Sequence, residues 1–165
     1  MKTEIFVRRS RIPAPAAAVF QWHDRPDAFA LLTPPWEHVR VVERSGGIAD
    51  GRMILEVRFG PLRRRWIAQH VDFQPDRQFR DVQIAGPFAL WEHTHSVEPD
   101  GPSACYLEDC IEYALPLGWL GRLVAGPFVR KNWIVCLTTG TASLRKLCYQ
   151  LIQEIRLPFE DLFAG

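Results

Sequence analysis

Six short strand-like segments, each separated from the next by a turn signal, dominate the middle of this 165-residue chain. The turn signals are rich in glycine, proline and aspartate, as at Gly60-Pro61 and Pro75-Asp76. Connections this short join antiparallel neighbours, so the segments predict an antiparallel meander. The predicted strands cover residues 37–44, 52–59, 64–74, 78–85, 88–98 and 104–114.

Helical patterns flank this region on both sides. A first strand over residues 4–12 is followed by two short helical stretches, "APAAAVFQWH" and "RPDAFALL", and Asp24 is placed to cap the second. From residue 128 onward the apolar residues recur at gaps of three and four, which is one face of a long amphipathic helix. Gly140 lies within that apolar stripe, which indicates close packing or a place that needs room.

The order of these elements predicts the fold class. A strand, two short helices, six strands and one long helix make an α+β fold of the helix-grip type, in which a curved antiparallel sheet of about seven strands wraps around the C-terminal helix. The length fits one domain with a real core. We therefore expect a single domain over residues 1–155 and a tail over 156–165 whose apolar side chains cover a neighbouring surface.

Composition and charge favour a folded globular protein and argue against some classes of function. The chain is 47% hydrophobic and 24% charged, which is typical of a folded globular protein. A formal net charge of +1 argues against nucleic acid as a partner, and the basic run Arg63–Arg65 is interpreted as a solvated strand start. The oligomeric state stays open.

Targeting and cysteine patterns favour a cytoplasmic location. No apolar run is long enough to span a bilayer, and the N-terminal "MKTEIFVRRS" lacks the apolar core of a secretory signal. The four cysteines form no CxxC pair, so reduced thiols are the simplest interpretation.

Three segments resemble the START-like superfamily, also called SRPBCC, which includes polyketide cyclases, pollen-allergen-type carriers and coenzyme Q-binding proteins. They read "VFQWHDRPDAFALLTPP", "FRDVQIAGPFALWEHTHSV" and "EDCIEYALPLGWLGRLVAG". The resemblance covers nearly all of the chain to about residue 150 and is greatest for a bacterial ligand-binding group. It implies a helix-grip domain, but the superfamily holds binders and enzymes alike, and fold alone does not choose between them.

One predicted strand carries an unusual face. Trp91, His93 and His95 alternate along it, so all three point to the same side. The more apolar face of the next strand carries Asp109, which a hairpin would bring near His93, within a residue of register. The preceding strand, residues 78–85, adds Phe79, Asp81 and Gln83 if these alternate residues point to the same face. The shared face would then hold Phe79, Asp81, Gln83, Trp91, His93, His95, Leu107, Asp109, Ile111 and Tyr113.

Four interpretations of this face compete. A ligand pocket is the first choice, because pockets combine apolar walls with a few convergent polar groups. An enzyme of the cyclase or dehydrase type would use His93 as a general base held by Asp109. A purely structural role would leave the histidines satisfied by carboxylates in a filled core. In the pocket interpretation the further walls come from Trp66, Trp133 and Leu137, and the partner is a small hydrophobic or amphipathic molecule.

The fourth interpretation is a metal site. Two histidines at i and i+2 on a strand are a genuine ligand spacing. The sequence places no cysteine or further histidine beside His93 and His95, and nothing fixes the facing of His38 and His70. We therefore expect no metal and no cofactor.

Two further features, His23 and the segment over residues 115–126, can each be interpreted in two ways. His23 at the end of the first short helix is either a helix C-terminal cap or a pocket residue. The segment "LPLGWLGRLVAG", residues 115–126, is either a core-covering turn or a mobile apolar flap. As a flap it could touch a membrane transiently, which would suit delivery of a quinone or lipid.

Overall fold

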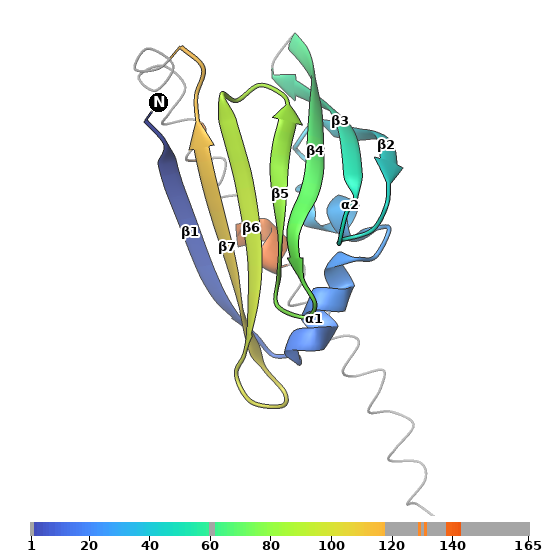
Figure 1. Ribbon diagram of the computed structural model, residues 1–165, viewed down its shortest axis with the longest axis vertical. Helices are drawn as coiled ribbons and strands as arrows, with labels where there is room; N and C mark the ends of the chain where they lie inside the picture. The colour runs from blue at the N-terminus through green and yellow to red at the C-terminus, as the bar shows by residue number, and fades with distance from the viewer. Residues whose placement is uncertain (1, 60–61, 118–128, 130, 132–137, 143–165) are drawn as a thin grey trace, which may run out of the picture.

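The computed structural model describes residues 2–59, 62–117, 129, 131 and 138–142. Over these ranges the chain forms two short helices and a single seven-stranded sheet (Figure 1). The elements are β1 (Glu4–Ile12), α1 (Ala16–His23), α2 (Ala28–Leu32), β2 (Val39–Ser45), β3 (Arg52–Phe59), β4 (Leu62–Gln74), β5 (Gln78–Ala85), β6 (Leu90–Pro99) and β7 (Cys105–Ala114).

The predicted meander is confirmed. Strands β2 to β7 follow one another across the sheet, and β1 pairs with β7, giving the order β1-β7-β6-β5-β4-β3-β2. Every pairing is antiparallel, and each meander strand begins and ends within two residues of its predicted bounds. The α+β fold class and the seven-stranded sheet are therefore as the sequence predicts.

Helix α1 covers one face of this sheet. It begins after Pro15, whose carbonyl accepts the first helical hydrogen bond, from the amide of Val19. Its buried residues include Phe20, whose ring lies 5.9 Å from that of Phe73 on β4 and 6.0 Å from that of Phe79 on β5. The face toward α1 is therefore the inner face of the sheet.

The predicted cap of the second helix is wrong. Asp24 instead ends α1, and its carboxylate accepts a 2.8 Å hydrogen bond from the amide of Ile48, far along the chain. Helix α2 begins after Asp27, whose side chain makes no capping hydrogen bond and pairs with Arg25 at 2.9 Å. A side-chain oxygen competes for any nearby amide, and the turn before β3 supplies one.

Part of the predicted C-terminal helix falls within the described residues. Residues 129, 131 and 138–142 are helical, and the short helical piece lies behind the sheet in Figure 1. The guanidinium of Arg8 on β1 donates a 2.8 Å hydrogen bond to the Thr138 hydroxyl, which fixes this piece against the inner face. The remainder of the predicted helix and the tail over 156–165 lie outside the described residues.

Gly140, which lies in the apolar stripe of the predicted C-terminal helix, packs closely against the end of α2. A Cβ added there would lie 3.3 Å from the carbonyl oxygen of Leu32 and 3.5 Å from a methyl group of its side chain. The glycine therefore lets the helical residues approach the end of α2, and the close packing is against α2.

Among the residues that the structure describes, the buried apolar side chains form two separate clusters. The α1 cluster joins α1 to one end of the sheet, and the aromatic cluster occupies the other end, under Phe29 and Val129. The α1 cluster consists of Ile12, Ala14, Val19, Phe20, Trp22, Ala28, Ile48, Phe79, Val97, Cys105 and Leu107. The aromatic cluster consists of Leu55, Val57, Trp66, Trp91, Ile111, Tyr113 and Leu115, with Phe88 packed against them.

The Gly140→Ala variant tests the packing against α2. Helix propensity alone would stabilise the protein by about 1 kcal/mol. Because the new methyl group meets a backbone carbonyl, we expect no gain and a loss of up to about 2 kcal/mol, measured by urea denaturation. The matched control is Ala142→Gly, an exposed helical position where propensity alone should cost about 1 kcal/mol. A clearly stabilised Gly140→Ala protein would contradict this packing.

Candidate functional site

A belt of ionisable side chains crosses the inner face between the two apolar clusters. Cross-strand register brings its members together, since Asp109 on β7 lies opposite His95 on β6, and Asp81 on β5 lies opposite both His93 on β6 and His70 on β4. We call these five residues the His–Asp belt. Burial is deep, with Asp109 only 5% exposed and His95 only 8% exposed.

The two carboxylates of the belt are shared among three imidazoles. Asp109 Oδ1 lies 2.8 Å from His95 Nδ1 and accepts a 3.2 Å hydrogen bond from His93 Nε2. Asp81 uses one oxygen for His70 Nε2, at 2.8 Å, and turns the other toward His95 Nε2, at 3.5 Å. His95 thus lies between both carboxylates, although its Nδ1 meets Asp109 without hydrogen-bond geometry.

These contacts separate the proton affinities of the imidazoles. Burial alone would lower the pKa of His95, but the Asp109 and Asp81 carboxylates outweigh it and raise that pKa to about 9. The pKa of His70 is also raised, because Asp81 outweighs its burial. Burial and the neighbouring His95 lower the pKa of His93, although Asp109 opposes them. His95 is therefore positive and His93 neutral at pH 7.

The pKa values of the two carboxylates shift in the opposite direction to that of His95. Burial opposes ionisation of both, but contacts with the imidazoles hold the pKa values of Asp81 and Asp109 well below their ordinary range. Both are therefore anionic at neutral pH. The belt combines two buried negative charges with at least one buried positive charge, which is a costly arrangement unless each charge is paired.

Aromatic rings hold the belt in place. The His95 ring stacks on Phe79, with centroids 4.4 Å apart and planes inclined by 17°, and lies 3.9 Å from the His93 ring. The ring of His23 on α1 lies 5.5 Å from that of His95 and 5.8 Å from that of Phe79. Its Nδ1 donates a 2.7 Å hydrogen bond to the Val19 carbonyl, and burial together with His95 lowers its pKa to about 4.

The sequence-predicted site residues fall into three groups. Asp81, His93, His95 and Asp109 come together in the belt, while the other members of the predicted face divide between the apolar clusters. Gln83 does not join them, because its side-chain amide exchanges hydrogen bonds with the backbone of Phe88 and closes the β5–β6 turn. Trp133 and Leu137 lie outside the described residues, as do residues 118–126 of the predicted flap.

Two functional candidates were not placed by sequence reasoning. His70 belongs to the belt because it shares the inward parity of Trp66 on β4, and a bulge between Val71 and Gln74 lets Phe73 turn inward as well. His23 bonds its own helix, as the capping interpretation expects, and also contacts the belt. Four of the five histidines therefore gather at the inner face, and this concentration is the signal that could have found them.

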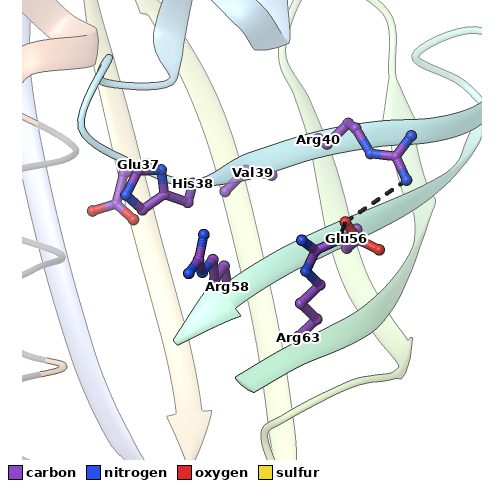
Figure 2. Close-up of a pocket in the computed structure, with 7 residues that line it drawn as sticks. All are labelled: Glu37, His38, Val39, Arg40, Glu56, Arg58 and Arg63. Atoms are coloured by element: carbon purple, nitrogen blue, oxygen red, sulfur yellow. Dashed lines mark ion pairs between the residues drawn. The ribbon is translucent and has the colours of Figure 1, made fainter. Parts of the chain in front are cut away.

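The fifth histidine, His38, lines a different feature. A surface hollow of about 410 Å³ lies along the edge strand β2 and its neighbour β3 (Figure 2). Arg40 and Arg63 approach Glu56 there, at 3.7 and 3.6 Å. The hollow is open, its exposed charges are paired and it contains no belt residue, so we take the belt as the candidate site.

The family comparison agrees with this fold. The model of the family described as "Polyketide cyclase / dehydrase and lipid transport" matches residues 12–132. The chain therefore belongs to this family, and the START-like (SRPBCC) assignment drawn from the sequence is confirmed. A search of the curated proteins found no significant match.

Solved structures share the helix-grip fold at low identity. A START superfamily protein from Mycobacterium smegmatis has a TM-score of 0.67 and 19% identity, covering 89% of this chain and 98% of that one. Norcoclaurine synthase from Thalictrum flavum, in complex with dopamine and hydroxybenzaldehyde, has a TM-score of 0.68 and 15% identity, covering 90% and 88%. The Zhui aromatase/cyclase from Streptomyces sp. R1128 has a TM-score of 0.64 and 15% identity, covering 94% and 97%.

Among the described residues, no helix is long and apolar enough to cross a bilayer. The cytoplasmic location stays a prediction, and so does the membrane contact through residues 115–126.

The Asp109→Asn variant tests the electrostatic role of the belt. Removing this charge leaves the buried His95 cation with Asp81 alone, so we expect a loss of about 3 kcal/mol in the free energy of unfolding. The control is Glu108→Gln, the neighbouring carboxylate on the outer face, which pairs with Arg9 at 3.6 Å and is half-exposed. That change should cost less than about 0.5 kcal/mol. Equal losses in the two variants would show that the belt is not a coupled unit.

Proposed function

We propose that the protein binds a small amphipathic molecule at the inner face of the sheet. The apolar part of the ligand packs against the aromatic cluster, and its polar group meets the His–Asp belt. The observation that carries this proposal is the position of the belt, which places paired charges at the boundary of a wall of aromatic rings. Ligand sites commonly combine such walls with a few polar groups.

The aromatic cluster supports the apolar half of this proposal. Trp66 and Trp91 meet edge to face with ring centroids 4.8 Å apart, and Phe88 continues the row at 5.5 Å from Trp66 and 6.1 Å from Tyr113. Edge-to-face rings offer faces and edges to a planar guest. The indole N–H of Trp66 is buried and meets no hydrogen-bond acceptor among the described residues, so it can donate to a ligand oxygen.

The belt supports the polar half. Paired charges cost desolvation free energy wherever they are buried, and well-packed apolar residues of similar volume are often at least as stabilising. A structural role alone therefore gives little reason for five ionisable side chains in one belt. Polar recognition of a guest gives one, because the imidazoles can donate or accept while the carboxylates hold their orientation.

The comparisons are in keeping with this class of ligand. The family description joins cyclase or dehydrase members with lipid transport, and both involve small, largely apolar molecules. The Thalictrum flavum enzyme was solved with dopamine and hydroxybenzaldehyde, which are small aromatic compounds. The ligand of the present chain is proposed as a class, a small molecule with an apolar body and at least one polar group.

Binding of anilinonaphthalene sulfonate, an amphipathic fluorescent probe, tests the proposal. Trp66→Phe keeps the aromatic surface and removes the indole N–H, so we expect affinity to fall several-fold to about tenfold, the worth of one hydrogen bond. Its matched control is Trp36→Phe, at a tryptophan that is 53% exposed, where affinity should not change. His93→Ala should also weaken binding while the protein stays folded, as checked by circular dichroism.

Two outcomes would contradict this function. Wild-type protein that binds no probe, and that carries no small molecule in native mass spectrometry after gentle purification, would remove the proposal. A His93→Ala protein that loses stability by about 1–3 kcal/mol, with no separate loss of affinity, would assign the belt a structural role.

Acid–base catalysis is the second candidate, and one contact favours it. Asp109 accepts a hydrogen bond from His93 Nε2, as a carboxylate does when it orients an imidazole for proton transfer. The other nitrogen of His93 would then remove a proton from a bound substrate, as an aldol cyclisation or dehydration requires. Such a reaction needs no covalent intermediate with the protein.

Turnover separates this candidate from carriage. If the protein is an enzyme of the cyclase or dehydrase type, purified protein should convert an aromatic polyketide, and His93→Gln should abolish turnover while the substrate still binds. Binding without conversion across a panel of such substrates would leave the carrier function standing. The control is His38→Gln, which changes a histidine of the surface hollow and should preserve the wild-type rate.

A further inference from the structure

We propose that Asp81, His93 and His95 form a binding site for one divalent transition-metal ion of the zinc class. One potential ligand atom from each of the three residues lies within 4.8 Å of the other two. Two imidazoles and a carboxylate are a donor set that suits Zn²⁺, Fe²⁺, Co²⁺ or Ni²⁺. Among the described residues this is the group of such side chains close enough to share an ion.

The sheet places the three residues without help from loops. His93 and His95 are alternate residues of β6, and Asp81 lies directly opposite His93 in the β5–β6 register. Ligand atoms about 2.0–2.2 Å from a tetrahedral ion lie roughly 3.4 Å from one another. The observed limit of 4.8 Å is longer than that separation, so binding would require the three side chains to rotate toward the ion.

Each proposed ligand has a neighbour at its other polar atom, as a hydrogen bond or ion pair for His93 and Asp81 and as a 2.8 Å contact with Asp109 for His95. Asp109 holds Nε2 of His93 and lies against Nδ1 of His95, and His70 bonds Oδ1 of Asp81. The atoms that remain are Nδ1 of His93, Nε2 of His95 and Oδ2 of Asp81. Partners of this kind, a carboxylate behind a histidine and a hydrogen bond behind a carboxylate, are the usual outer support of metal ligands.

Charge balance favours a divalent ion in particular. Asp109, which is buried, and Asp81, whose side chain is 19% exposed, supply two negative charges within reach of the proposed site. With neutral imidazoles as ligands, one divalent cation would neutralise both carboxylates. A monovalent ion would leave a buried charge uncompensated, which is costly in a site of low dielectric.

Three protein ligands leave at least one coordination position for a water molecule or a ligand oxygen. Trp91 lies next to His93, with ring centroids 5.9 Å apart, so that position would border the aromatic cluster. The sequence-based expectation of no metal rested on the shortage of a convincing third and fourth ligand beside His93 and His95, although a carboxylate could be the third. Asp81 now supplies one, and that expectation becomes the competing outcome of the test. The metal proposal does not rest on the proposed ligand-binding function.

The test is metal titration of chelator-treated, full-length protein. Zn²⁺ binding is measured by isothermal titration calorimetry, and Co²⁺ binding by its visible absorption, which reports nitrogen ligands and coordination number. We expect one ion per chain. His95→Ala and Asp81→Asn should each weaken Zn²⁺ binding by more than about 100-fold, and His70→Ala, which removes only an outer partner, by about 10–100-fold. His38→Ala should bind as the wild type does.

The proposal has clear failure points. Saturable Zn²⁺ binding that persists in both His95→Ala and Asp81→Asn would be adventitious, and wild-type protein with no saturable binding would overturn the site directly. If His95→Ala does not fold, His93→Gln, a smaller change in volume, replaces it. The probe-binding assay on the same metal-free samples separates the two proposals, since either one can fail while the other holds.

Discussion

The position of the His95 imidazolium between two buried carboxylates is the constraint on which the rest of the inner face depends. Asp109 and Asp81 come from the two strands on either side of β6, so the three charges connect β5, β6 and β7 directly. Neither carboxylate can be buried without the imidazole between them, and the imidazole keeps its proton because both carboxylates are present. The three charges are therefore interdependent, and removing one of them destabilises the other two.

This unit also explains why the apolar core is divided. A single continuous core would be expected in a domain of this size, yet within the part of the chain that the structure describes the α1 cluster and the aromatic cluster are separate. The belt occupies the strip of the inner face between them. At one end, α1 packs its buried side chains onto the sheet. At the other, aromatic edges and faces remain as the wall to which a guest is proposed to bind.

Much of this architecture could be predicted from the sequence, because it follows from local periodicity. Alternation placed Trp91, His93 and His95 on one face, and the parity of β7 placed Asp109 on the same face. It lies opposite His95, two residues along β6 from the expected His93. The facing of His70 stayed open because Phe73 on the same strand has the other parity. The bulge in β4 that lets both residues point inward leaves no simple mark in the residue pattern. The cap at Asp24 failed for a related reason, since its partner amide is distant in sequence.

The alternation of β6 also bears on how the strands find their pairing. A slip of one residue would turn His93 and His95 to the outer face and bring Glu92 and Thr94 inward, where Glu92 would lose its 3.0 Å ion pair with Arg80. A slip of two residues keeps the faces, and aliphatic side chains would tolerate it because one can replace another, but here it would separate the buried charges from their partners. The His–Asp belt thus specifies the register of β5, β6 and β7, because only one register pairs every buried charge.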